Sequence, residues 1–128
     1  MKIEHLAIWA DDIELLRQFY TKYFHAVSGE KYVNSKRNYS SYFLSFGEGG
    51  CRIELMHIPN LHEPASRTLM KGLTHFAVSI GSKEAVDALT ERLRTDGYRV
   101  VGEPRTSGDG YYESVILDPE GNTVEIVA

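Results

Sequence analysis

Short segments rich in β-forming residues alternate with one helical pattern in the first half of the chain. The first segment alternates apolar and polar positions, which is typical of a strand with one buried face. A stripe of apolar residues at helical spacing follows, with Glu14 three positions after Asp11 as in a capping box. The predicted strands lie at 2–9, 30–34, 40–46 and 51–57. This half therefore predicts the element order β-α-β-β-β.

The second half repeats the first. The segments IEHLAI and LTHFAV place His5 and His75 70 positions apart, and GCRIEL and GNTVEI place Glu54 and Glu125 71 positions apart. Two separate segments that recur at nearly one offset indicate a duplicated unit. The second helix is expected to begin after Ser82 and to end at Gly97. Its three later strands are predicted near 98–103, 111–117 and 122–127.

The duplication predicts an α+β fold made of two tandem modules. We place module 1 at about 1–57, a connector at about 58–72 and module 2 at about 73–128. A single helix covers only one face of a sheet, so each module would leave its other face open. We expect the two modules to form one domain, 1–128, in which the open faces line a curved, barrel-like cleft.

Strand parity places four polar residues on the open faces. Alternate side chains of a strand point to opposite faces, so His5 shares a face with Ala7 and Trp9 while the residues between them face the helix. The same parity applies to His75 in the second module. The glutamates of the last strands, Glu54 and Glu125, are each flanked by apolar residues that face the helix.

Two imidazoles and two carboxylates form a donor set that suits a divalent metal ion. Nickel, zinc, cobalt, manganese and iron all accept nitrogen and oxygen ligands of this kind. The predicted metal ligands are His5, Glu54, His75 and Glu125. In an octahedral ion, four protein ligands would leave coordination positions open for water or a substrate. The alternative is that these residues merely form the wet side of amphipathic strands.

Composition limits the partners and the cellular compartment that we expect for this protein. The 128 residues carry a net charge of −4, which argues against nucleic acid or a membrane as partner. Charges within the first dozen residues argue against a signal peptide, and no apolar run is long enough to span a bilayer. The single cysteine, Cys51, is typical of a reducing cytoplasm and is expected in the core.

The paired modules, with His near the start and Glu near the end of each, resemble the vicinal oxygen chelate superfamily. Its members include glyoxalase I, extradiol dioxygenases, methylmalonyl-CoA epimerase and bleomycin-resistance proteins. The ending LDPEGNTVEIV is similar to that of the superfamily, and the ligand set is similar to that of bacterial glyoxalase I. Glu54 favours this activity, since the dioxygenases need no ligand there and the epimerases typically have Gln.

The resemblance implies a metalloenzyme of the lactoylglutathione lyase kind, a lyase or isomerase. It would move a proton next to a carbonyl of a small α-oxygenated substrate, with or without a conjugated thiol. Glu125 would be the base and Glu54 its catalytic partner. The alternatives are a non-catalytic protein that binds a small molecule or drug, and an iron-dependent ring-cleaving dioxygenase.

The chain departs from glyoxalase I at two positions. The family often has Gly after its first helix, where this chain has His25. Glyoxalase I usually has an Arg on its first strand that helps bind the glutathione carboxylate, whereas the nearest open-face residue here is Trp9. The predicted substrate contacts are Trp9, Arg52 and Tyr112. His57 and His62 are expected at the surface, away from the metal.

The expected partners are a small-molecule substrate and a second copy of the chain. A symmetric homodimer is the commonest oligomer. The two modules of one chain could complete the site, or two chains could exchange modules. The residues leave both arrangements open.

Overall fold

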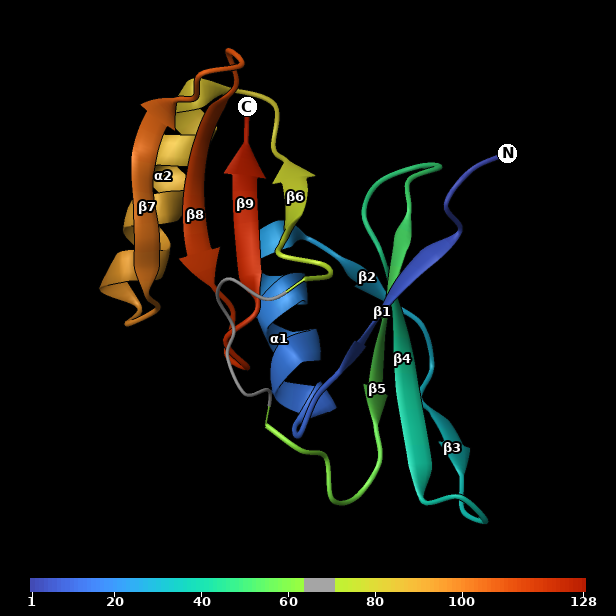
Figure 1. Ribbon diagram of the computed structural model, residues 1–128. Helices are drawn as coiled ribbons and strands as arrows, with labels where there is room; N and C mark the ends of the chain where they lie inside the picture. Colours follow the sequence, from blue (N-terminus) through green and yellow to red (C-terminus); the bar gives the residue numbers. More distant parts are fainter. Residues whose placement is uncertain (64–70) are drawn as a thin grey trace. The chain divides into compact units, whose positions relative to one another are not determined.

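The computed structural model describes residues 1–63 and 71–128 (Figure 1). The chain divides into two compact units, Met1–Glu63 and Pro64–Ala128. Each unit contains one helix and one sheet, which confirms the predicted α+β class and the two modules. The boundary between the units falls inside the predicted connector, of which residues 64–70 lie outside the described part. The grouping of both modules into one domain stays a prediction.

The first module holds a mixed sheet and the helix α1. Its elements are β1 (His5–Trp9), α1 (Ile13–Phe24), β2 (Val27–Ser28), β3 (Tyr32–Asn34), β4 (Tyr39–Ser45) and β5 (Arg52–His57). The strand order is β1-β5-β4-β2, and β3 also pairs with β4. β1 runs parallel to β5, and β4 runs antiparallel to it. The two-residue strand β2 was not predicted, because so short a segment has no readable period.

The second module repeats this topology. Its elements are β6 (Phe76–Ser79), α2 (Lys83–Thr95), β7 (Val100–Thr106), β8 (Tyr112–Leu117) and β9 (Thr123–Val127). The order is β6-β9-β8-β7, with β6 parallel to β9 as β1 is parallel to β5. The predicted β-α-β-β-β order is thereby confirmed. Neither helix in the described ranges is long and apolar enough to cross a membrane.

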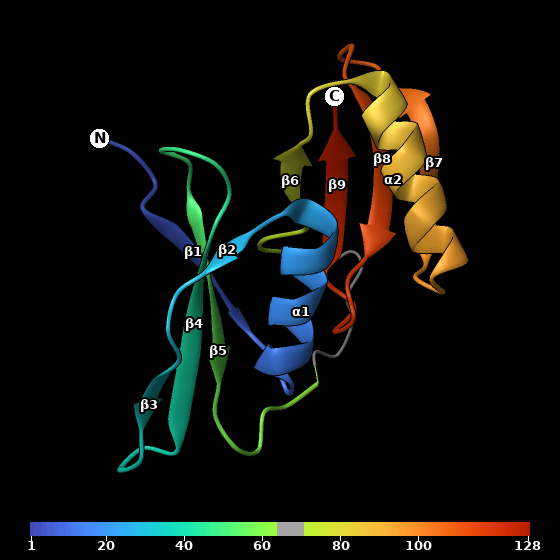
Figure 2. The same cartoon turned by 180° about the vertical axis from the view of Figure 1, so that it is seen from behind.

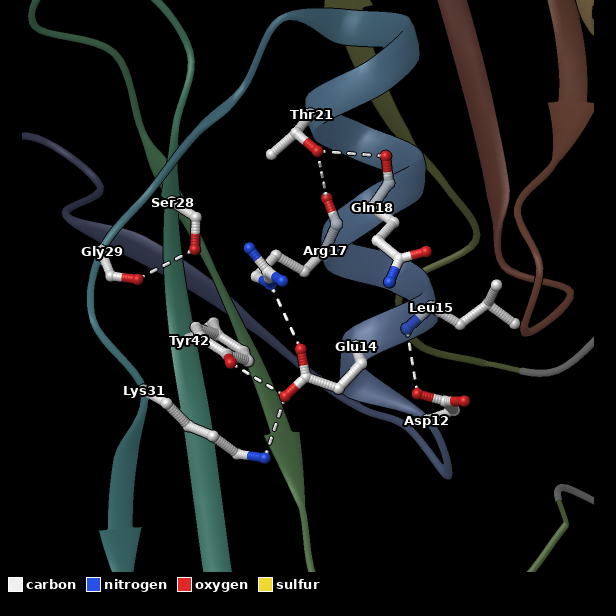
Figure 3. A network of polar contacts seen from close by, with 10 residues as sticks. All are labelled: Asp12, Glu14, Leu15, Arg17, Gln18, Thr21, Ser28, Gly29, Lys31 and Tyr42. Carbon is white, nitrogen blue, oxygen red and sulfur yellow. Dashed lines mark hydrogen bonds and ion pairs between the residues drawn. The ribbon is translucent and has the colours of Figure 1, made fainter.

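Helix α1 begins one residue later than predicted. The carboxylate of Asp12, not that of Asp11, accepts a hydrogen bond from the backbone N–H of Leu15 at 2.9 Å. The two aspartates are adjacent, and the sequence pattern does not separate them. Glu14 consequently makes no capping-box contact, and its carboxylate instead accepts hydrogen bonds from Tyr42 at 2.8 Å and Lys31 at 3.0 Å (Figure 3). These contacts fasten the first turn of the helix to β4 and to the segment before β3.

Helix α2 begins and ends where the sequence predicted. The Ser82 hydroxyl accepts a hydrogen bond from the N–H of Ala85 at 3.2 Å. Gly97 follows the helix with a φ of 90°, and the N–H of Tyr98 then bonds back to the carbonyl of Leu93 at 2.9 Å. A left-handed residue at this position lets the chain close the last turn, and glycine adopts it without steric cost.

Each helix packs on one face of its own sheet. α1 contacts β4 and β5, and α2 lies against β8 and β7, as Figure 2 shows. The side chains beneath the helices are fully buried aliphatic residues, namely Leu44 and Leu55 in module 1 and Ile116, Val124 and Ile126 in module 2. The residues of opposite parity on β5 and β9 are only partly buried. The strands therefore have the two distinct faces that the pattern predicted.

Candidate functional site

The first predicted histidine–glutamate pair lies in module 1, whose sheet we call sheet 1 (that of module 2 is sheet 2). It lies on the face of sheet 1 that α1 does not cover. Glu54 lies opposite Ala7 in the parallel β1–β5 pair, and His5 is two residues from Ala7 on the same face. The Nε2 atom of His5 is 3.7 Å from Oε2 of Glu54. The side chain of His5 is 38% exposed, and that of Glu54 is 14% exposed. The imidazole nitrogen and the carboxylate thus meet at an accessible position.

The second pair has the same geometry in the other module. Glu125 lies opposite Ala77 in the parallel β6–β9 pair, and His75 immediately precedes β6. The Nε2 atom of His75 is 3.3 Å from Oε1 of Glu125. In both modules, therefore, an alanine is paired with the glutamate, and the histidine lies two residues before that alanine. The sequence repeat corresponds to a repeated side-chain arrangement.

The residue before each histidine engages the other ring nitrogen. Nδ1 of His5 is hydrogen-bonded to the carboxylate of Glu4, and Nδ1 of His75 lies 3.1 Å from the hydroxyl of Thr74. Hydrogen bonds from His5 and Arg52 lower the pKa of Glu4, which favours its ionised form. An ionised carboxylate only accepts, so Nδ1 of His5 is the donor. In the neutral ring, Nε2 then carries the lone pair that faces Glu54.

Glu54 has a further partner that the sequence did not predict. The hydroxyl of Tyr39 donates a hydrogen bond of 2.8 Å to Oε1 of Glu54. Burial raises the pKa of Tyr39, and the nearby carboxylate of Glu54 adds to the increase. Tyr39 lies one residue outside the strand predicted at 40–46, although its parity with Phe43 would have placed it on this face. The error in the strand boundary concealed it.

Aromatic side chains surround the first pair. The ring of Tyr39 makes edge contacts with Trp9 at 6.3 Å and with Tyr32 at 6.0 Å between ring centroids. The ring of Phe43 makes an edge contact with His5 at 5.3 Å. Trp9 is 48% exposed, so part of its ring remains open to a ligand. The open face of module 1 therefore combines polar groups with an aromatic surface.

Arg52, a predicted substrate contact, lies beside this pair. It is opposite His5 in the β1–β5 register, and its guanidinium lies 4.2 Å from the centroid of the Phe43 ring. It also forms an ion pair with Glu4. The structure thus places Arg52 and Trp9 on the face that carries His5 and Glu54.

Tyr112, the third predicted substrate contact, contacts helix α2. Its hydroxyl donates a hydrogen bond of 2.8 Å to Asp87 of α2, and Lys83 of the same helix lies 5.1 Å from its ring centroid. Tyr112 therefore lies on the helix side of sheet 2. The residue opposite Glu125 is Val115, and three positions separate Tyr112 from it, which puts the two on opposite faces.

Three other residues with side chains that can bind metals lie outside the two pairs. Cys51 was expected in the core but is exposed, because β5 begins one residue later. His57 was expected at the surface, yet its Nδ1 lies 2.9 Å from the carbonyl oxygen of Ala10 and its side chain is half-buried. His62 is exposed, as predicted. None of the three approaches the two histidine–glutamate pairs through a hydrogen bond or ion pair within the described ranges.

Each module supplies two donors of the kind that bind metal ions. Among the residues that the structure describes, no group of three or more His, Cys, Asp or Glu side chains lies close enough to hold an ion. The structure brings His5 to Glu54 and His75 to Glu125. A four-ligand centre would need both pairs.

Comparisons with known proteins agree with this repeated architecture. The family model for the glyoxalase/bleomycin resistance protein/dioxygenase superfamily matches residues 2–126. An uncharacterised protein of Bacillus subtilis (strain 168), YqjT, is 28% identical over 130 residues, which cover 98% of each chain.

Solved structures show the same fold. The trypanothione-dependent glyoxalase I of Leishmania major superposes with a TM-score of 0.75 at 20% identity, over 99% of this chain and 86% of that one. A glyoxalase/bleomycin resistance protein/dioxygenase domain from Frankia sp. EAN1pec gives 0.81 at 18% identity, over 99% and 96%. With the family model covering nearly every residue, the chain belongs to the glyoxalase/bleomycin resistance protein/dioxygenase superfamily.

Proposed function

We propose that the protein is a metal-dependent, glyoxalase-like lyase or isomerase that moves a proton next to a carbonyl of a small α-oxygenated substrate. One observation carries this proposal, namely the same histidine–glutamate pair at the same strand register in both modules. Duplication alone would also repeat the residues of a solvent-exposed face, but here each histidine lies within 3.7 Å of its glutamate. A metal centre built from two halves would use one such pair from each module.

The donor set fits a divalent first-row metal ion. The ligands in this proposal are His5, Glu54, His75 and Glu125. Metal-binding histidines commonly engage their second ring nitrogen with a carboxylate or another acceptor, and Glu4 and Thr74 occupy those places here. Nickel, zinc, cobalt, manganese and iron all accept such nitrogen and oxygen donors. When bound, the ion would supply positive charge that stabilises negative charge developing on the substrate oxygen.

Residues of the chain transfer the proton, hold the ion and contact the substrate. The carboxylate of Glu125 takes the proton from the carbon next to the carbonyl and returns it to the former carbonyl carbon, while the proton of the substrate hydroxyl moves to the former carbonyl oxygen, so that no atom is gained or lost. Glu54 and the two histidines keep their positions. Trp9 and Arg52 lie on the face that holds Glu54 and supply an apolar surface and a positive charge for the substrate. The family membership is consistent with this chemistry.

The substitution Glu125→Gln tests the reaction. Metal-loaded protein is assayed with methylglyoxal and a thiol, first glutathione and then other low-molecular-weight thiols. We expect a decrease in kcat of at least about 100-fold, because the amide cannot accept the proton. Glu48→Gln, at an exposed position in the loop before β5, is the matched control and should leave kcat unchanged. Wild-type protein that binds no divalent metal and transforms none of these adducts would overturn the proposal.

The aromatic face of module 1 supports a second candidate, a protein that binds a small molecule without transforming it. Trp9, Tyr39 and Tyr32 form a row of ring contacts beside the first pair. This candidate predicts that a chelator leaves the affinity for an aromatic probe unchanged. The metalloenzyme predicts that removal of the metal weakens binding of an α-oxygenated ligand.

We also propose that the protein acts as a homodimer, as expected from the sequence. Sedimentation equilibrium of the wild-type chain should give twice the mass of one chain. A single-chain mass across the micromolar range would contradict this part of the proposal without affecting the metal site.

A further inference from the structure

The carboxylates of Glu54 and Glu125 differ in their surroundings. Oε1 of Glu54 accepts the hydrogen bond from Tyr39 at 2.8 Å, while Oε2 lies 3.7 Å from Nε2 of His5. Oε1 of Glu125 lies 3.3 Å from His75, and within the described ranges this is its one polar side-chain contact. Glu54 therefore accepts a hydrogen bond from a phenol on one oxygen and has His5 beside the other, whereas the described contact of the Glu125 carboxylate is with its histidine alone.

Strand pairing identifies the counterpart of Tyr39 in the second module. The residue opposite Glu54 is Phe43, and the residue opposite the second glutamate is Val115. A tyrosine lies four positions before each of them, Tyr39 in module 1 and Tyr111 in module 2. Both modules thus carry a phenol at the same place in the repeat.

Within the described part of the chain, the hydroxyl of Tyr39 contacts its glutamate and that of Tyr111 does not. Tyr111 lies just before β8 and is 58% exposed. Its backbone carbonyl accepts hydrogen bonds from the N–H of Ser107 at 2.7 Å and from the hydroxyl of Ser107 at 3.0 Å. Tyr39 is instead part of β4, and the rings of Trp9 and Tyr32 contact it from two sides. These contacts restrict the ring of Tyr39 and point its hydroxyl at Glu54.

We infer that Tyr39 is a positioning residue that fixes Glu54 as the permanent carboxylate ligand and thereby leaves the mobile role to Glu125. A hydrogen bond to one oxygen of a ligating carboxylate selects the other oxygen for the metal and removes rotational freedom from the ligand. Among the residues that the structure describes, none donates such a bond to Glu125, which keeps the freedom that a proton acceptor needs. The inference rests on the proposed metal-dependent function.

The test compares Tyr39→Phe with Tyr111→Phe, its matched control. Nickel affinity of the apo protein is measured by competition with a chelator, and circular dichroism checks the fold. Tyr39→Phe removes only the hydroxyl and keeps the ring contacts. We expect its affinity for nickel to decrease by about tenfold or more, in the range found when partners of metal ligands are removed. Tyr111→Phe should bind nickel as the wild-type protein does.

A double variant separates positioning from a general loss of structure. In the Glu54→Gln background the hydroxyl of Tyr39 no longer has a ligating carboxylate to orient. Adding Tyr39→Phe to Glu54→Gln should therefore leave the nickel affinity unchanged, whereas structural damage would lower it again.

The outcomes distinguish this inference from the function on which it rests. If the wild-type protein binds nickel and Tyr39→Phe binds it equally well, the inference is wrong and the metal-dependent function stands. If the two phenylalanine variants lose affinity equally, the positioning role is also wrong. If the wild-type protein itself binds no nickel or other divalent ion, the proposed function fails and this inference with it.

Discussion

Glu54 lies directly opposite Ala7 in the parallel β1–β5 pair. A methyl group at this position leaves space above the strand, and His5 and Glu54 extend toward each other across it. Ala77 has the same relation to Glu125. Small residues at both positions are therefore part of the candidate site, although they carry no chemistry of their own.

Enlarging this alanine should obstruct the pair without disturbing the core. Ala7 is exposed, so Ala7→Leu places its larger side chain in the space beside His5 and Glu54. We expect the affinity for nickel to decrease by roughly tenfold or more, which corresponds to about 1.4 kcal/mol. Ala7→Ser adds a single oxygen atom and is the control, with affinity close to that of the wild-type protein. Equal nickel affinity in the leucine variant would show that the space is not used.

Glu14 should contribute to stability in a pH-dependent way. The ammonium group of Lys31 and the hydroxyl of Tyr42 lower the pKa of Glu14 below its ordinary value of 4.5. The pair contacts are partly exposed, so near neutral pH we expect Glu14→Gln to lower the free energy of unfolding by about 0.5–1 kcal/mol. The control is Glu91→Gln, whose carboxylate is exposed and pairs with Arg94. Glu91→Gln should lower the free energy of unfolding by less than Glu14→Gln does.

The sign of the pH dependence follows from the lowered pKa. Because the pKa of Glu14 is lower in the folded protein than in the unfolded chain, its contribution to stability is fully present above pH 4.5. That contribution is lost as the pH falls through the folded-state pKa. The difference in unfolding free energy between wild type and Glu14→Gln should therefore shrink below pH 4.5. Urea unfolding at a series of pH values measures it. A difference that grows as pH falls would contradict the assignment.

His25 occupies a backbone conformation that favours glycine. It caps the C-terminus of α1 with φ 55° and ψ 28°, in the left-handed region. We expect His25→Gly to raise the free energy of unfolding by about 0.5 kcal/mol, because the relief of strain exceeds the extra entropy of the unfolded chain. His25→Ala retains the strain and should give no such gain. Thermal unfolding of the two variants compares them directly.

The only tryptophan of the chain should contribute to substrate binding, and Tyr112 should not. Trp9→Ala removes the exposed ring on the face of Glu54. We expect it to raise KM for the methylglyoxal–thiol adduct by about 2–10-fold, the equivalent of one lost aromatic contact. Tyr112→Phe loses only its bond to Asp87 on the helix side and should leave KM unchanged. The reverse result would place the substrate on the helix side of sheet 2.

The sequence predicted the modules and the open-face glutamates because both depend on periodicity. Glu54 and Glu125 each lie between two buried residues on the last strand of their module. This alternation can be recognised in the amino-acid sequence alone. The repeat then identified His5 and His75 as their partners. Family membership and fold followed from the same segments.

Features that depend on strand boundaries and pairing were predicted less well. Cys51 was assigned to the core because β5 was started one residue early. Tyr39 was missed because β4 begins one residue before the predicted strand. The face of the sheet on which Tyr112 lies was not predicted, because the β8–β9 register, which pairs Val115 with Glu125, is set by tertiary packing and not by local pattern.

The central claim is that the two pairs hold one divalent ion together. Equilibrium dialysis against nickel, followed by metal analysis, tests it with wild-type protein, His75→Ala and the control His62→Ala, which alters an exposed histidine that belongs to neither pair. We predict one ion per chain in the wild-type protein and in His62→Ala, and a loss of bound nickel in His75→Ala. A wild-type protein without bound nickel, or a His75→Ala variant that retains a full equivalent, would contradict the claim.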